Sequence, residues 1–409
     1  MKPTHRSPLL LERARQTFRW DLLRGGCHGI LETTWQTFAL LVAIRVFGAE
    51  DTLKSFLPAA FGIGLILNPL ILSMVGRTRM RIGNLLALYA LGGGTAFGFA
   101  VLTQDLLGYI ALVVLAQIFF AQTVPLMTQV YSENYKGTER GKRFAVTAVI
   151  GSLVGIVVSS GGGKLLDLDL GFYRLLFLLC FLAGLGSALA YHRMPTQTMQ
   201  DIKVGNPWSD IPLIWRDRVF GWMLAGWMLM GLGNLMTLPI RVEYMANPLY
   251  GINATNAQVG LILGAIPLTF RILSTLLWGA LFDRWNMITM RIVLNLFFLL
   301  SVVLYFSTES LVLMGLSTAL LGMAMGGGGI IWQLWVTKVA PPGKVSSYMS
   351  IHGATTGLRA AAAPFLGYFL LVQFSPGITA VFAGLLIACS TVIFIPLYQQ
   401  IQERGNNAL

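Results

Sequence analysis

Runs of about twenty apolar residues recur along the whole chain, and no other feature limits the fold as strongly. A helix of about 20 apolar residues is long enough to cross the hydrocarbon layer of a membrane. Twelve runs of this kind are separated by short connections. They cover residues 21–47, 53–75, 82–103, 106–130, 144–165, 171–191, 219–242, 257–281, 289–307, 310–336, 348–372 and 377–398. The sequence therefore predicts an all-α membrane protein with twelve transmembrane helices.

The composition excludes a soluble enzyme. Only 11% of the 409 residues are charged, whereas soluble proteins carry about 25%. The three cysteines, Cys27, Cys180 and Cys389, lie far apart in apolar stretches, which is typical of buried small side chains and not of a disulfide framework or a zinc site. The basic N-terminal stretch has no apolar segment of signal-peptide length, so no cleaved presequence is expected.

The basic residues predict the orientation of the spans. Most of the 29 lysines and arginines, Arg284 and Arg291 among them, lie in the N-terminal segment or near the loops that share its side. Cytoplasmic loops carry this excess. Both termini are therefore expected in the cytoplasm, in a multi-pass protein of the inner (cytoplasmic) membrane. Loops facing an anionic leaflet also account for the net charge of +12 without a nucleic-acid partner.

The longest polar stretch divides the spans into two sets of six. It covers residues 193–218. We predict two pseudo-symmetric six-helix bundles, residues 1–192 and 219–409, joined by this central cytoplasmic loop. Such a duplication is common among transporters.

One short motif occurs at equivalent places in both sets. Between the eighth and ninth spans stand Gly279, Asp283 and Arg284, and between the second and third stand Gly76 and Arg77. The first of these stretches resembles the signature loop of the major facilitator superfamily, and the second resembles the end of that signature without its aspartate. With twelve spans and a central loop, the resemblance covers the whole chain.

The resemblance implies a transporter that works by alternating access, with spans one, eight and eleven among those that line its cavity. In the loop, Gly279 would let two helices approach closely, and Asp283 and Arg284 would help to close one face. Gly76 and Arg77 are the corresponding candidates in the first set. The alternative is that these charges only set the topology.

Few ionisable residues fall near the middle of the spans, where a charge is costly and usually functional. Arg24, His28 and Glu32 follow one another at steps of four in the first span; Arg271 lies in the eighth and Arg359 in the eleventh. Arg24 is close enough to the cytoplasmic end for its side chain to reach the membrane surface. The other four are candidates for the transport site.

These residues suggest two roles. Arg271 and Arg359 would bind an anionic group, because a guanidinium matches carboxylates and phosphates. The alternative is a structural ion pair between Glu32 and one arginine. Glu32, with His28 one turn away, would carry the coupling proton. A sodium ion is an alternative that a single mid-depth carboxylate does not support.

Other polar or small side chains on the expected lining spans complete the predicted site. They are Gln117, Gln122, Asn234, Trp332 and Gln333. The glycine-rich stretch 151–163 is expected to allow close helix packing.

The prediction is a proton-coupled secondary active transporter for a small or amphiphilic organic anion, acting as a monomer without a cofactor. A multidrug or lipophilic-solute exporter is the alternative. An embedded enzyme is disfavoured because the chain has neither HExxH nor a nucleotide-binding loop, and a receptor because all loops are short. Metal binding by His28, Glu32 and His352 would require the first and eleventh spans to meet.

Overall fold

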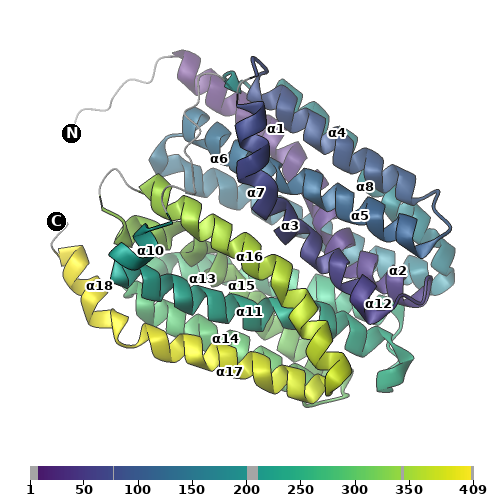
Figure 1. The fold of residues 1–409 in the computed structure, drawn as a ribbon. Helices are drawn as coiled ribbons and strands as arrows, with labels where there is room; N and C mark the ends of the chain where they lie inside the picture. Colours follow the sequence, from purple (N-terminus) through teal and green to yellow (C-terminus); the bar gives the residue numbers. More distant parts are fainter. Residues whose placement is uncertain (1–7, 77, 200–210, 342–344, 407–409) are drawn as a thin grey trace.

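A computed structural model describes residues 8–76, 78–199, 211–341 and 345–406, and within these ranges the chain is almost entirely helical. A β-bridge joins Arg81 to Thr198. Long helices lie side by side, and the beginning of α1 and the end of α18 lie on the same side of the bundle (Figure 1). We call this the terminal side and the other the opposite side.

The first span is one continuous helical stretch with a wider turn in its middle. It consists of α1 (Pro8–Thr33), the π-helical turn η1 (Thr34–Phe38) and α2 (Ala39–Arg45). The sequence predicted its start at residue 21, but the helix begins at Pro8, because its charged first turns are also helical. Wider turns of this kind are often found at functional sites.

The helices before the central polar stretch match the other predicted spans closely. They are α3 (Asp51–Val75), α4 (Ile82–Ala100), α5 (Leu106–Ala121), α6 (Thr123–Asn134), α7 (Gly137–Leu168), η2 (Leu170–Phe172) and α8 (Tyr173–Arg193). Together with α1 and α2 we call these the N-terminal helices.

The remaining helices form the second set, which we call the C-terminal helices. They are α10 (Leu213–Arg216), α11 (Arg218–Ala246), η4 (Pro248–Tyr250), α12 (Asn256–Gly260), η5 (Leu261–Ala265), α13 (Ile266–Arg284), α14 (Met287–Phe306), α15 (Leu311–Val339), α16 (Val345–Gln373), α17 (Pro376–Phe394) and α18 (Leu397–Asn406). The eighth span contains a π-helical turn, η5, as the first span does.

Eleven stretches in the described part of the chain are long and apolar enough to cross a membrane. The first span is not among them, because α1 is rich in charged residues. Counted with the eleven, α1–η1–α2 completes the predicted set of twelve. The predicted all-α membrane fold is confirmed, whereas the cytoplasmic position of the termini and the division into two bundles remain predictions.

Within each set the helices pack tightly on their neighbours in space. In the N-terminal helices α1 lies against α7 and α8, and α4 against α5 and α8. In the C-terminal helices α11 lies between α16 and α17, and α13 packs on α15. The two sets meet where α3 packs on α16 and where α7 packs on α12 and α13.

Glycines allow these contacts between the sets. A Cβ atom at Gly62 of α3 would lie 2.8 Å from Ala360 Cβ of α16, so the two backbones approach closely. In α7, a Cβ at Gly163 would lie 2.8 Å from Ala257 Cα, and one at Gly155 would lie 2.9 Å from Leu268 Cδ1. The close packing predicted for residues 151–163 is therefore present.

Candidate functional site

Glu32 of α1 and Arg271 of α13 face each other across the contact between the two sets. Glu32 Oε1 lies 3.9 Å from Arg271 Nη1, and Arg271 Nη2 donates a hydrogen bond of 2.7 Å to Ser152 Oγ of α7. On the same helix as Glu32, His28 Nε2 lies 3.8 Å from Glu32 Oε2, and Gln36 donates to Glu32 Oε1. We call Glu32, Arg271, Ser152 and His28 the interface cluster.

The interface cluster is partly accessible although its residues lie well inside their spans. The exposed fractions of the side chains are 43% for His28, 26% for Glu32 and 22% for Arg271. A longer, looser ion pair of this kind binds less tightly than a short hydrogen-bonded one. The arrangement leaves both charged groups able to exchange partners.

A second network on α1 was not predicted. Asp21 is fully buried and accepts hydrogen bonds from Arg24 Nε at 2.6 Å, from Tyr131 and from Thr147. Arg24 also donates to the hydroxyl of Tyr131. The expectation that Arg24 reaches the membrane surface is wrong, because its guanidinium is held by a buried carboxylate one turn before it.

Arg359 lies in a different place from Arg271. Its Nη1 donates to the carbonyl oxygen of Trp227, and its Cζ lies 5.7 Å from the centre of the Trp227 ring. His352 lies on the same face of α16 as Arg359. The centre of its ring is 5.3 Å from that of the Trp227 ring and 5.1 Å from that of the Trp335 ring. Among the described residues, Arg271 and Arg359 share no hydrogen-bond or ion-pair partner.

Arg291 completes this second group. Although counted with the charges near the cytoplasmic loops, Arg291 lies in the second turn of α14 and is 1% exposed. Its Cζ lies 3.9 Å from the centre of the Trp227 ring and 5.9 Å from that of Phe394. We call Trp227, Arg291, Trp335, His352 and Arg359 the C-terminal aromatic cluster.

The other predicted polar residues are used for packing or remain partly accessible. Gln117 and Gln122 are buried and donate to the carbonyl oxygens of Leu57 and Gly64, which ties α5 to α3. Trp332 Nε1 lies 3.3 Å from Thr356 Oγ1 and its ring packs on His352.

Asn234 lies in α11, and its buried Oδ1 has no hydrogen-bond partner among the described residues. Gln333 belongs to α15, and its side chain is outside the described residues.

Two charged residues near the opposite side, Lys54 and Glu243, are buried where the two sets meet. Lys54 Nζ of α3 lies 2.8 Å from Glu243 Oε1 of α11 and 2.7 Å from Asp51. Tyr368 of α16 and Asn247 also donate to Glu243. The sequence signal for this ion pair was the presence of opposite charges at the ends of two spans on the same side.

A second set of polar contacts lies beside it. Arg45 of α2 donates to the carbonyl oxygens of Ala246 and Ala254 and to Asn256 Oδ1. The carboxylate of Asp167, in the last turn of α7, accepts from the backbone N–H groups of Asn256 and Ala257 at 2.7 and 3.0 Å. An anion is stabilised at a helix N-terminus. The carboxylate of Asp167 therefore stabilises the contact between α7 and the start of α12.

Comparison with known proteins relates part of the chain to one family and nearly all of it to one fold. The model of the Major Facilitator Superfamily matches residues 242–407. Among solved structures, the nucleoside transporter NupG superposes with a TM-score of 0.69 at 13% identity, over 95% of this chain and 98% of that one. The family model therefore matches the C-terminal helices of this chain, and nearly the whole chain has the fold of this transporter. The match agrees with the resemblance seen in the motifs.

Two further solved structures of transporters are similar along most of the chain. A D-xylose-proton symporter gives a TM-score of 0.68 at 14% identity, covering 93% of this chain and 96% of that one. A POT family transporter in complex with 5-aminolevulinic acid gives 0.68 at 13%, covering 94% and 96%. No curated protein sequence matches the chain. The fold of this chain is therefore the one that these membrane transporters share.

The two loops that resemble the major facilitator signature are only partly described. Gly76 ends α3 with a right-handed conformation, and Arg77 lies outside the described residues. In α13, a Cβ at Gly279 would meet no described atom within 4 Å, so the close helix approach expected there is absent. Arg284 is exposed at the end of α13, and the Asp283 side chain is outside the described residues.

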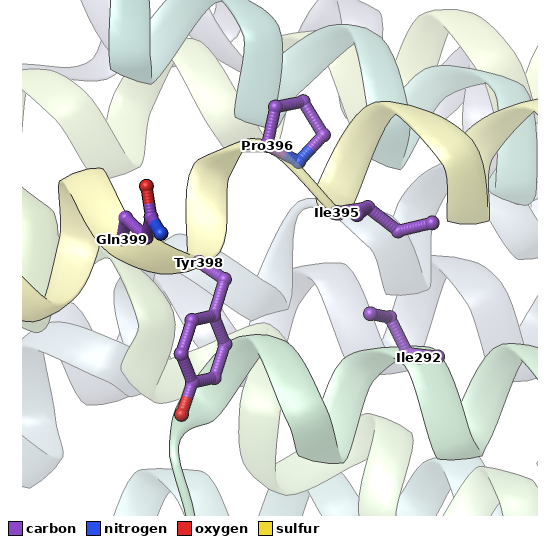
Figure 2. Close-up of a pocket in the computed structure, with 5 residues that line it drawn as sticks. All are labelled: Ile292, Ile395, Pro396, Tyr398 and Gln399. Atoms are coloured by element: carbon purple, nitrogen blue, oxygen red, sulfur yellow. The ribbon is translucent and has the colours of Figure 1, made fainter.

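A surface hollow is lined by residues that belong to neither cluster. Figure 2 shows it between α14 and the junction of α17 and α18, lined by Ile292, Ile395, Pro396, Tyr398 and Gln399. Its lining carries no charge, and none of these residues belongs to the predicted site. We assign it no part in binding.

Proposed function

We propose that this protein is a proton-coupled secondary active transporter that moves a small or amphiphilic organic anion by alternating access. The observation that carries the proposal is the loose pair of Glu32 and Arg271, 3.9 Å apart on helices of different sets. An ionisable pair between the two moving parts of a transporter can link binding to movement.

The coupling follows from competition for one guanidinium. When Glu32 is ionised, its carboxylate neutralises Arg271. When Glu32 is protonated, that attraction is lost and Arg271 can bind the carboxylate or phosphate of a substrate. Binding of the anion is then favoured together with binding of a proton. His28, 3.8 Å from Glu32 and the most exposed of the three, would pass the proton to and from water.

The direction in which the site opens follows from the contacts between the two sets. The pairs of Lys54 with Glu243 and of Asp167 with the start of α12 join the sets near the opposite side. If the positive-inside rule places the terminal side in the cytoplasm, this conformation is the one that opens inward. The proposed location is the cytoplasmic membrane, with the protein acting as a monomer.

Two further observations support the proposal. One similar structure is a D-xylose-proton symporter and another holds 5-aminolevulinic acid, so the fold serves proton-coupled and small-molecule transport. In the same proposal Arg359, Asn234 and Trp332 remain substrate contacts on the C-terminal helices, although Arg359 lies deeper than Arg271, within the C-terminal aromatic cluster.

The test measures proton movement in proteoliposomes that contain a pH-sensitive dye, with a panel of organic anions and lipophilic cations. We expect at least one anion to move protons in the wild type, and this movement to be lost in Glu32→Gln and Arg271→Gln. The matched controls, Glu50→Gln and Arg174→Gln, remove one negative and one positive charge at exposed positions near the opposite side. Both should retain the proton movement. Proton movement with cations only would favour the exporter and contradict the anion proposal.

A further inference from the structure

Among the described residues, the C-terminal aromatic cluster gathers buried polar nitrogens that have no hydrogen-bond partner. The unpartnered donors are the indole Nε1 of Trp227 and of Trp335, all three guanidinium nitrogens of Arg291 and Nε of Arg359. Both ring nitrogens of His352 are also unpartnered, and in a neutral imidazole one of them donates and the other accepts. Buried polar groups in proteins are nearly always hydrogen-bonded, so a group of exceptions in one place needs an explanation.

All these groups surround a single indole ring. Arg291 and Arg359 lie 3.9 and 5.7 Å from the centre of the Trp227 ring, and the rings of His352 and Trp335 lie 5.3 and 6.2 Å from it. Four helices, α11, α14, α15 and α16, bring them together. The unpartnered groups are therefore gathered around one side chain.

The chemistry of the donors defines what that group must be. Arginine and tryptophan side chains donate and cannot accept, so they do not satisfy one another. Among the described side chains, no carboxylate lies within ion-pair distance of Arg291 or Arg359. Contacts with aromatic rings offset only part of the cost of burying two positive charges. An acceptor that also carries negative charge would satisfy both needs.

A third buried arginine shows that this shortage is local. Arg241 is 1% exposed and also lies over an aromatic ring, that of Tyr305. However, it donates to the hydroxyls of Ser301 and Ser317 at 2.9 and 3.2 Å. The C-terminal helices thus supply acceptors to a buried arginine where it has a structural role. Among the described residues, they supply Arg291 only with the faces of aromatic rings.

We propose that the C-terminal aromatic cluster is a binding site for an oxyanion, the carboxylate or phosphate group of a small or lipid-like molecule. Arg291 is its principal ligand, with Arg359 beside it. The inference deepens the proposed function and rests on it in one respect, since the transported anion is one source of that group. The other source is the headgroup of an anionic lipid.

The test measures binding to the purified protein in detergent, without a membrane or a gradient. Sodium phosphate and sodium acetate are titrated against sodium chloride at constant ionic strength, with tryptophan fluorescence and the unfolding temperature as readouts. We expect a saturable response in the wild type and in Arg174→Gln, and an affinity weaker by about tenfold or more in Arg291→Gln. Equal affinity in Arg291→Gln, or no saturable response in the wild type, would overturn the proposal.

A second variant covers the case in which Arg291→Gln does not fold. Trp227→Phe keeps an aromatic face for both arginines and removes one donor, so a folded protein with an affinity weaker by about fivefold is expected. An unchanged affinity in Trp227→Phe counts against the site.

Two further arms separate this inference from the proposed function and identify the source. If phosphate binding is lost in Arg271→Gln but kept in Arg291→Gln, the interface cluster alone binds anions, and this inference fails while the proposed function stands. If Arg291 is required for binding but no anion moves protons in liposomes, this inference stands and the proposed function fails. In nanodiscs, weaker phosphate binding with phosphatidylglycerol than with phosphatidylcholine identifies the lipid headgroup as the occupant; equal binding identifies a soluble anion.

Discussion

Two regions of this protein bury charge in different ways. Near the opposite side, Lys54 and Glu243 are both buried and paired at 2.8 Å, with Tyr368 donating to the same carboxylate. In the C-terminal aromatic cluster, Arg291 and Arg359 are equally buried but have no carboxylate among their described neighbours. The buried charges of the first region neutralise each other, whereas those of the second need a further group that carries negative charge.

The difference separates charges that hold the structure together from charges that are available to a ligand. A buried pair whose hydrogen bonds are satisfied is strongly disturbed when one partner is removed. A buried charge without a partner is a cost to the fold, so its removal should be tolerated or even favourable. The interface cluster is intermediate, because Glu32 and Arg271 are paired loosely and remain accessible.

The largest effect is expected at the pair near the opposite side. Glu243→Gln leaves the buried ammonium of Lys54 with Asp51 as its remaining acidic partner, and should lower the free energy of unfolding by about 3 kcal/mol. Thermal or denaturant unfolding in detergent measures this. The double variant Lys54→Met with Glu243→Leu removes both charges and should recover most of the loss. A double variant as unstable as Glu243→Gln would mean that the pair is not the cause.

The two buried arginines of the C-terminal helices provide a direct comparison. Arg241→Met removes hydrogen bonds to Ser301 and Ser317 and should cost about 2 kcal/mol. Arg291→Met removes an unpartnered charge and should be neutral or stabilising in a protein freed of bound anions. Unfolding of both variants in chloride buffer measures the difference. Equal destabilisation by the two substitutions would show that Arg291 is held as firmly as Arg241.

A smaller effect is expected where glycine sets the distance between the two sets. Gly62→Ala places a methyl group 2.8 Å from Ala360 Cβ and should separate α3 from α16 at a cost of about 1 kcal/mol. Gly329→Ala is the control, because a Cβ there meets no atom within 4 Å, and alanine in an exposed helix should stabilise by about 0.5 kcal/mol. Comparable stability of the two variants would indicate that the contact between α3 and α16 adapts freely.

The positions of the spans could be predicted because apolar length alone determines them, and the predicted ends of most helices agree to within a few residues. The start of the first span could not, since charged turns such as those around Asp21 and Arg24 are polar yet helical. Sequence also brought His28 and Glu32 together, because residues four apart share a helix face.

The partners contributed by distant helices were beyond the sequence. Arg271 meets Glu32, and Arg359 meets Trp227, but nothing in the order of residues distinguishes these two arginines. Arg291 was counted with the charges near the cytoplasmic loops because it lies near a helix end, and only the packing of Trp227 and Phe394 over it shows that it is buried. Whether a side chain near a helix end is buried depends on the neighbouring helices that pack over it.

The central claim, that Glu32 couples the anion to a proton, is tested most directly by comparing two modes of transport in one variant. In proteoliposomes with Glu32→Gln, exchange of a labelled anion for the same unlabelled anion should continue, because Arg271 remains and no net proton movement is needed. Accumulation of that anion driven by a pH gradient should be lost. If Glu32→Gln still accumulates the anion in proportion to the pH gradient, the proton is carried elsewhere and the account is contradicted.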